Sequence, residues 1–233
     1  MVKTAIILAG GFGTRLQNIV QDVPKPMAPI NNRPFLEFQL DYWIQQGITK
    51  FILSIGYLKD SIIDHFGKNY KGAQIEYLVE TQPLGTGGGL LLSAKDIDET
   101  FLVLNGDTFI EVDLDSLYKF HIESESTWTL ALFKTSDFKR FLTLDVGQNG
   151  EILSLNSKQE ISSGLANGGA YLIEPSTLKR IDYNSGDSVS LESQLLPNFI
   201  KNGGKLFGQE CLGKFIDIGL PEDYLRAKDV LPK

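Results

Sequence analysis

The sequence is poor in the residues on which most protein metal and redox centres depend. Its 233 residues include one cysteine, Cys211, and two histidines, His65 and His121. A single cysteine can form neither an internal disulfide nor a cysteine-based zinc site, and nothing points to an oxidising compartment. Two histidines likewise argue against a histidine-rich metal centre. We therefore expect a soluble cytoplasmic protein.

Long apolar runs and an excess of positive charge are also missing. No run approaches the ~20 residues of a membrane span, and the apolar run at residues 5–9 is too short for a signal-peptide core. The formal net charge is −7, from 22 Lys and Arg against 29 Asp and Glu. An acidic chain lacks the basic face that binds nucleic acid or an anionic membrane, although a local basic pocket for phosphates stays compatible with it. We expect no nucleic-acid partner and no membrane partner.

Short apolar segments alternate with amphipathic ones along the first half of the chain. Expected strands there are residues 4–8, 51–55, 74–79 and 101–104, and expected helices are residues 35–46, 60–66 and 87–94. Expected strands in the second half are residues 127–133, 141–145, 151–155 and 169–173, and expected helices are residues 190–201 and 221–230. Continuous apolar strands in alternation with helices predict an α/β fold, with a mainly parallel sheet covered on both faces. We predict one domain over residues 1–233.

The most informative motif follows the first expected strand and reads Leu8-Ala9-Gly10-Gly11-Phe12-Gly13-Thr14-Arg15-Leu16. Glycines let the backbone turn tightly and point its N–H groups at an anion, and ligands bind at this end of parallel strands. The motif predicts a cradle for nucleotide phosphates with Arg15 as charged partner. A Walker loop is excluded because its lysine is absent, and a dinucleotide fingerprint is excluded because Leu16 stands where Gly or Ala is needed. The alternative is a plain glycine turn.

A lysine between two prolines follows, in Pro24-Lys25-Pro26. Both rings restrict the backbone, and Pro26 disfavours the helical conformation for Lys25. Such a backbone suits a lysine that aims a compact ammonium at a phosphate. A solvated loop lysine is the alternative interpretation.

Two aspartates stand in settings that suit a metal ion. Asp107, in Asn105-Gly106-Asp107-Thr108, follows a buried strand and so lies in the ligand crevice, where Mg²⁺ binds one or two carboxylates together with substrate phosphates. Asp217 lies within Phe215-Ile216-Asp217-Ile218-Gly219, where a charge needs a partner or an ion. The sequence alone does not show that the two meet. Alternatively, Asp107 is a turn residue and Asp217 a helix cap or salt-bridge partner.

Together these motifs resemble the signature of the sugar-1-phosphate nucleotidyltransferases, which join a nucleoside triphosphate to a sugar 1-phosphate and release pyrophosphate. The resemblance continues through residues 80–88, 105–108, 215–219 and 221–224. It implies a single Rossmann-like domain of the nucleotide-diphospho-sugar transferase type. Residues 1–125 would form its nucleotide-binding half and residues 126–233 its sugar-phosphate-binding half. The chain ends soon after Tyr224, so the β-helix acyltransferase domain of some relatives is not expected.

Within the family, residues 26–29 and 33–37 are most similar to the guanylyltransferases that act on D-glycero-α-D-manno-heptose 1-phosphate. This similarity implies transfer of GMP from GTP to that sugar 1-phosphate. The product would be a nucleotide sugar for surface polysaccharides such as capsule or lipopolysaccharide. Alternatives that stay open are mannose or glucose 1-phosphate as acceptor, and UTP or dTTP as donor.

The resemblance also implies the site residues. Nucleotide-binding positions are Leu8, Ala9, Gly10, Gly11, Gly13, Thr14, Arg15, Lys25, Glu80, Gln82, Gly87 and Asp107. Arg15, Lys25 and Asp107 would be catalytic, and Asp107 and Asp217 would hold one Mg²⁺ that bridges the phosphates of both substrates. Sugar-phosphate-binding positions are Asn105, Gly106, Lys158, Asn167, Gly169 and Glu192. Lys158 would hold the acceptor phosphate. Ser157 replaces a glutamate usual in relatives, and Glu192 could supply that carboxylate instead.

Glu80 is the candidate reader of the base, because an ionised carboxylate accepts from adjacent N–H donors such as those of guanine. Alternatively, Glu80 faces solvent and Gln82 bonds only to backbone. We expect the aromatic side chains of Tyr57, Phe109 and Tyr171 in the core rather than in a pocket.

A rival function from another class is a non-catalytic sensor of nucleotide sugars on the same fold. The charged candidate residues favour an enzyme over a sensor, because a sensor could lose Lys25 or Asp107 without harm and this sequence keeps both. No Ser–His or Cys–His arrangement is evident, which agrees with direct transfer and no covalent intermediate. The sequence leaves a homodimer open.

Overall fold

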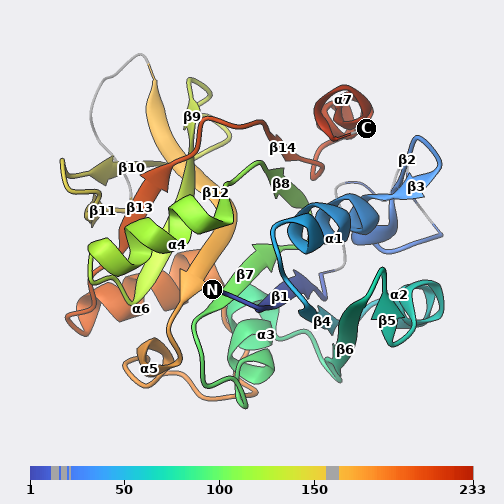
Figure 1. Cartoon of the computed structure of the whole chain (residues 1–233), viewed down its shortest axis with the longest axis horizontal. Coiled ribbons are helices and arrows are strands. Elements are labelled where there is room, and N and C mark those ends of the chain that lie inside the picture. Colours follow the sequence, from blue (N-terminus) through green and yellow to red (C-terminus); the bar gives the residue numbers. More distant parts are fainter. Residues whose placement is uncertain (12–15, 17–19, 21, 156–162, 233) are drawn as a thin grey trace.

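A computed structural model describes residues 1–11, 16, 20, 22–155 and 163–232 of the chain. Its centre is a mixed sheet with the strand order β11-β10-β12-β7-β1-β4-β6-β5, in which β9 also pairs with β12 and β13 with β9 (Figure 1). The parallel strands of the first half are β1 (Thr4–Ala9), β4 (Lys50–Ile55), β6 (Ala73–Val79) and β7 (Phe101–Asn105). One continuous sheet therefore joins the two halves of the chain.

The second half extends this sheet mainly with antiparallel strands. The long strand β12 (Gly164–Ile173) runs antiparallel to β7, to β9 (Trp128–Thr135) and to β10 (Thr143–Val146). The remaining strands of the sheet are β11 (Ile152–Ser154), β13 (Phe207–Glu210) and β5 (Asn69–Tyr70). The pairing of β10 with β11 is antiparallel, as expected for strands joined by a short turn.

The two faces of the sheet carry separate apolar cores. In β1, Ala5 and Ile7 pack into one core and Ile6 and Leu8 into the other, because successive side chains of a strand point to opposite faces. The first core is covered by α1 (Phe35–Gln45), α2 (Lys59–Phe66) and α4 (Leu114–Glu123). The second core is covered by α3 (Gly85–Ser93) and α6 (Leu196–Lys201). The predicted α/β fold, with helices on both faces, is confirmed.

Smaller elements sit at the edge of the sheet where the parallel strands end. These are the 3₁₀ turn η1 (Lys25–Met27), the hairpin of β2 (Pro29–Ile30) with β3 (Arg33–Pro34), and the pair of β8 (Thr108–Ile110) with β14 (Phe215–Asp217). A third apolar cluster fastens the closing helix α7 (Pro221–Val230) here, with Ile216 and Ile218 packed against Ala227. The short helix α5 (Pro175–Leu178) lies elsewhere, after β12.

Several elements differ from their sequence-based expectation. Residues 114–123, for which the sequence predicts no element, form α4. Its Asp113 cap accepts a hydrogen bond from the Ser116 amide at 2.7 Å. The helix expected at 190–201 opens with a π-helical turn, η2 (Leu191–Leu195), and continues as α6. Pro197 lacks the N–H of a regular helical ladder, which accounts for the irregular start. Among the described residues, every helix falls short of the length and hydrophobicity that crossing a membrane requires.

Candidate active site

Two adjoining cavities, of about 240 and 380 Å³, lie at the carboxyl ends of β1 and β7. The ends of these two paired strands lie in close contact. The Gly106 amide donates to the Leu8 carbonyl at 3.0 Å, and a Cβ on Gly106 would come within 2.6 Å of that oxygen. The smaller cavity gathers Leu8, Ala9, Gly11, Lys25, Asn105, Gly106, Asp107 and Glu192 among its lining residues. The fold thus brings predicted nucleotide and sugar-phosphate residues to one place.

Lys25 and the two aspartates form the charged centre of this crevice. The Lys25 Nζ lies 2.5 Å from Asp107 Oδ2 and 4.0 Å from Asp217 Oδ1. The Lys25 side chain is only 13% exposed, so it is not a solvated loop lysine. The predicted disfavour of a helical backbone at Lys25 is wrong, since η1 begins there and is closed by the bond from the Met27 amide to the Pro24 carbonyl.

Backbone pairing explains how aspartates far apart in the sequence meet. Asp217 in β14 lies opposite Thr108 in β8, and the Ile218 amide donates to the Asp107 carbonyl at 2.9 Å. Gly219 closes the turn by donating its amide to Asp217 Oδ1 at 2.6 Å. A Cβ on Gly219 would come within 2.8 Å of the Lys25 Nζ, so a larger residue here would displace the lysine or the Asp217 carboxylate.

The charges of Asp107 and Asp217 favour a cation bound by both carboxylates. Burial raises the pKa of Asp217 above its ordinary value, and the Asp107 carboxylate raises it further. Two neighbouring carboxylates suit Mg²⁺, which takes few protein ligands and completes its shell with phosphate and water oxygens. Among the described residues, no group of three or more His, Cys, Asp or Glu offers a site made by the protein alone.

Gln39 is a site residue that the sequence analysis missed. It is 1% exposed, and its Nε2 donates to the Asn105 carbonyl at 2.9 Å and also to the Thr108 carbonyl. The amide therefore fixes both ends of the loop that carries Asp107. Its place in α1, among the apolar residues of an amphipathic helix, was the available signal, because a polar residue at such a position needs a partner.

Glu80 lies beneath the start of the glycine loop. Its Oε1 accepts from the Ser54 hydroxyl at 2.9 Å, and its Oε2 accepts from the Leu84 amide at 3.1 Å. A Cβ on Gly10 would come within 2.3 Å of Glu80 Oε1, which accounts for a glycine there. Each carboxylate oxygen keeps acceptor capacity beyond these bonds, so Glu80 is anchored and remains able to accept from a ligand.

Gln82 and Gly87 are placed less directly. Gln82 is exposed beyond β6. Gly87 is buried, its amide donates to the Val189 carbonyl at 2.8 Å, and a Cβ there would meet Leu195. The Gly87 amide is therefore already paired within the protein, and its visible role is close packing of α3 against η2. Both assignments to the nucleotide stay predictions.

Glu192, which lines both cavities, is the centre of a polar network. Its Oε1 accepts from Asn105 Nδ2 at 3.3 Å and from the Tyr171 hydroxyl at 3.4 Å, and its Oε2 accepts from the Thr86 hydroxyl at 3.1 Å. Asn167 Nδ2 in turn donates to the Tyr171 hydroxyl at 2.7 Å. The network brings Asn105, Asn167 and Glu192 together, and their binding of a sugar stays a prediction.

A bulge in β12 shapes this side of the crevice. The pairing with β9 shifts register between Asn167 and Tyr171. Gly169 has φ +75°, and a Cβ there would lie 2.4 Å from the Thr108 hydroxyl oxygen. Bulges of this kind re-aim side chains next to active sites. Asn167, at the start of the bulge, lines the 380 Å³ cavity.

The expectation for the three aromatic side chains is confirmed for Phe109 and Tyr171, which are 2% and 0% exposed. It is wrong for Tyr57, which is 38% exposed in the turn after β4, where the chain has left the sheet. Burial raises the pKa of the Tyr171 hydroxyl well above its ordinary value, so Tyr171 stays protonated while it donates to Glu192. Gly13, Thr14, Arg15, Ser157 and Lys158 lie outside the described residues, and their assignments stay predictions.

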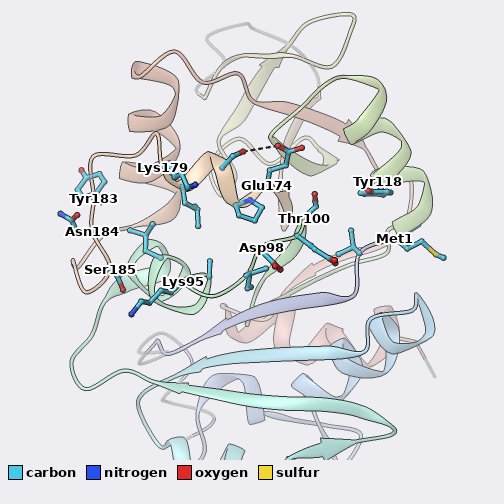
Figure 2. A pocket seen from close by; sticks show the side chains of 18 residues that line it. Met1, Lys95, Asp98, Thr100, Tyr118, Glu174, Lys179, Tyr183, Asn184 and Ser185 are labelled. Atoms are coloured by element: carbon cyan, nitrogen blue, oxygen red, sulfur yellow. Dashed lines mark hydrogen bonds between the residues drawn. The ribbon is translucent and has the colours of Figure 1, made fainter.

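A larger cavity, of about 1160 Å³, lies at the opposite edge of the sheet (Figure 2). Met1 and Thr100 precede β1 and β7, and Glu174 follows the antiparallel strand β12. These residues mark the amino ends of the parallel strands. Substrates of open α/β sheets bind at the carboxyl ends instead, so size alone does not make this cavity the active site.

Comparison with known proteins agrees with the fold. A model of the family described as "Nucleotidyl transferase" matches residues 4–233. The chain therefore belongs to the nucleotidyl transferase family.

Particular relatives narrow the comparison. The chain is 41% identical over 222 residues to the D-glycero-alpha-D-manno-heptose 1-phosphate guanylyltransferase of Campylobacter jejuni, covering 94% of this chain and 96% of the relative. It is 37% identical over 229 residues to the enzyme of that name from Aneurinibacillus thermoaerophilus, covering 97% of each. The crystal structure of HddC from Yersinia pseudotuberculosis superposes with a TM-score of 0.85 at 33% identity, covering 98% of this chain and 99% of that one. HddC has also been crystallised complexed with GMP-PN.

Proposed function

We propose that this protein is a guanylyltransferase that transfers GMP from GTP to D-glycero-α-D-manno-heptose 1-phosphate and releases pyrophosphate. The observation that carries the proposal is the meeting of Lys25, Asp107 and Asp217 where the two cavities adjoin. We assign the 240 Å³ cavity at the glycine-rich strand end to the nucleotide and the 380 Å³ cavity, called the acceptor cavity below, to the sugar 1-phosphate. Full-length similarity to two guanylyltransferases with this acceptor in their names supports the choice of substrates.

The chemistry follows from the charges of the substrates. The attacking oxygen of the sugar phosphate is already an anion, so the reaction needs no general base to create the nucleophile. In-line attack on the α-phosphorus of GTP is then limited by positioning and by repulsion between the two anions. The task of the site is to hold both phosphates at one point and to offset their charge.

Each part of the site has a role in this scheme. Leu8 and Ala9 line the nucleotide side with Gly11, and Lys25 offsets charge at the α-phosphate. Asn105, Asn167 and Glu192 bind the hydroxyls of the acceptor, and the predicted contributions of Arg15 and Lys158 are to hold the leaving phosphates and the acceptor phosphate. Asp107 and Asp217 would hold Mg²⁺, which when bound draws the phosphates of the two substrates together and neutralises developing charge.

A pyrophosphate-release assay tests the proposal. GTP, UTP, dTTP and ATP are each combined with heptose, mannose and glucose 1-phosphates, with and without Mg²⁺. We expect the highest kcat/KM for GTP with the heptose 1-phosphate, and no turnover after chelation of the metal. A preference for UTP or dTTP would contradict guanylyl transfer, and pyrophosphate release from no pair would favour a sensor over an enzyme.

A further inference from the structure

Arg140 is a charged residue of the acceptor cavity that the scheme above leaves without a role. It lines the 380 Å³ cavity together with Asn105, Asp107, Asn167, Glu192 and Asp217. The other charged residues that line this cavity in the described part of the chain are acidic. An acceptor phosphate that enters here meets carboxylates, and Arg140 is the lining group that offsets them.

Contacts with Asp223 and Phe141 hold the Arg140 guanidinium in place. Its Nη2 pairs with the carboxylate of Asp223 in α7, which is 6% exposed. Its Cζ lies 4.9 Å from the centre of the Phe141 ring, and Phe141 packs edge-on against Phe215 at 5.7 Å. Phe215 begins the strand that carries Asp217. The anchor and the aromatic support thus fix the guanidinium relative to the proposed metal site.

The pairing with Asp223 leaves Arg140 both charge and hydrogen-bond donors to spare. Asp223 also pairs with Arg226, whose Nη2 lies 3.7 Å from Oδ1, so two guanidinium groups share one carboxylate. Among the described residues, Asp223 is the one acceptor in contact with the Arg140 guanidinium, which carries five N–H donors. Asp217 and Asp137 act on the guanidinium only through their electrostatic field. Burial lowers the pKa of Arg140, but the pairing with Asp223 and the field of the three aspartates outweigh burial and raise it overall.

On the basis of the proposed function, we propose that Arg140 binds the phosphate group of the sugar 1-phosphate. A planar guanidinium with free, neighbouring N–H donors matches two phosphate oxygens. The phosphate charge at this contact is present before and during the reaction, so the contact contributes to acceptor binding more than to the chemical step. Asp223 is a positioning residue that acts through Arg140.

Variants separate this role from a purely structural one. Removal of Arg140 alone would leave the buried Asp223 carboxylate without its closer partner. The test variant is therefore the double substitution Arg140→Met with Asp223→Asn. The single substitution Arg140→Lys is measured as well. Arg226→Ala is the matched control, because Arg226 pairs with the same carboxylate and does not line the acceptor cavity. Thermal unfolding of each variant reports on the fold. Steady-state kinetics with GTP and several sugar 1-phosphates report on binding.

We expect the double variant to raise the KM for sugar 1-phosphate by about tenfold to a hundredfold and to leave the KM for GTP within about twofold. The increase should be the same for every sugar, since the phosphate is the common group. Arg140→Lys should give a smaller increase, and Arg226→Ala none. An increase confined to one sugar would assign Arg140 to a hydroxyl and overturn the proposal, as would a fall in melting temperature with an unchanged KM.

A binding measurement tests the role of Arg140 independently of the proposed function. Calorimetric titration of mannose 1-phosphate into wild type and double variant, with a GTP analogue that cannot release pyrophosphate, needs no turnover. Weaker binding by the double variant supports the role of Arg140 even where the assay finds a different nucleotide or sugar. Equal binding by both proteins overturns it, whatever the assay shows.

Discussion

The ammonium of Lys25 and the carboxylate of Asp107 meet at 2.5 Å, although 81 residues separate them in the chain. Lys25 stands on a 3₁₀ turn and Asp107 on the loop after β7, and the same nitrogen lies 4.0 Å from Asp217. Three segments thus place one cation and two anions at the junction of the nucleotide and acceptor cavities.

Substitution of either aspartate should remove activity and leave the fold intact. Asp107→Asn and Asp217→Asn each remove one negative charge from the proposed Mg²⁺ site, and we expect turnover to fall by several orders of magnitude. Steady-state rates at saturating Mg²⁺, with melting temperatures as a control for folding, make the measurement. Rates near the wild-type value in either variant would refute the metal assignment.

Lys25 and Lys158 should affect different kinetic constants. Lys25→Ala should mainly lower kcat, because its charge is used most as the α-phosphate reorganises. Lys158→Ala should mainly raise the KM for sugar phosphate, because it holds a charge that is unchanged before and during reaction. Lys68→Ala serves as control, because Lys68 is exposed in the turn between α2 and β5 and lines neither cavity. A reversed pattern would mean that the two roles are exchanged.

Glu80 should set the preference for guanine. Its carboxylate is able to accept from guanine N1–H and N2–H₂, whereas adenine presents a lone pair at N1 and leaves the charge unpaired, at a cost of about 1–3 kcal/mol. Glu80→Gln should therefore weaken the use of GTP and narrow its lead over ATP by roughly tenfold or more.

A matched variant separates recognition from positioning of Glu80. Ser54→Ala removes the hydroxyl that donates to Glu80 Oε1 and keeps the carboxylate. We expect this variant to retain most of the preference for GTP in a comparison of kcat/KM values. Full retention of the preference in Glu80→Gln would place guanine recognition on other groups, such as Gln82 or the backbone.

His121 should make the stability of the fold sensitive to acid. Its side chain is 0% exposed and bonds to the Thr129 hydroxyl at 2.8 Å, and burial lowers the pKa of His121 to about 4 from an ordinary value of 6.5. Between these values the unfolded chain binds the proton and the folded chain does not, so the free energy of unfolding falls as the pH drops from about 6.5 to about 4. Urea unfolding of wild type and His121→Gln at several pH values measures how the free energy of unfolding depends on pH. The same dependence in both proteins would exclude His121 as the cause of the acid sensitivity.

The sequence by itself determined the alternation of elements and the character of the binding edge. Apolar runs bounded by glycine and proline fixed the strands β1, β4, β6 and β7 to within a residue or so of their observed bounds. Local chemistry also marked three candidates: Lys25 by its two flanking prolines, Asp107 by its place after a buried strand, and Asp217 by its apolar neighbours.

Tertiary structure decided which distant groups meet. Pairing of β8 with β14 brings Asp217 to Asp107, and packing of α1 delivers Gln39 to the loop that carries Asp107. The bulge in β12 and the π-helical turn direct Asn167 and Glu192 to one cavity, and α7 supplies the anchor for Arg140. These contacts depend on register and packing between segments far apart in the chain. The local pattern of a sequence can show that a group such as Gln39 needs a partner, but it does not specify which distant group that partner is.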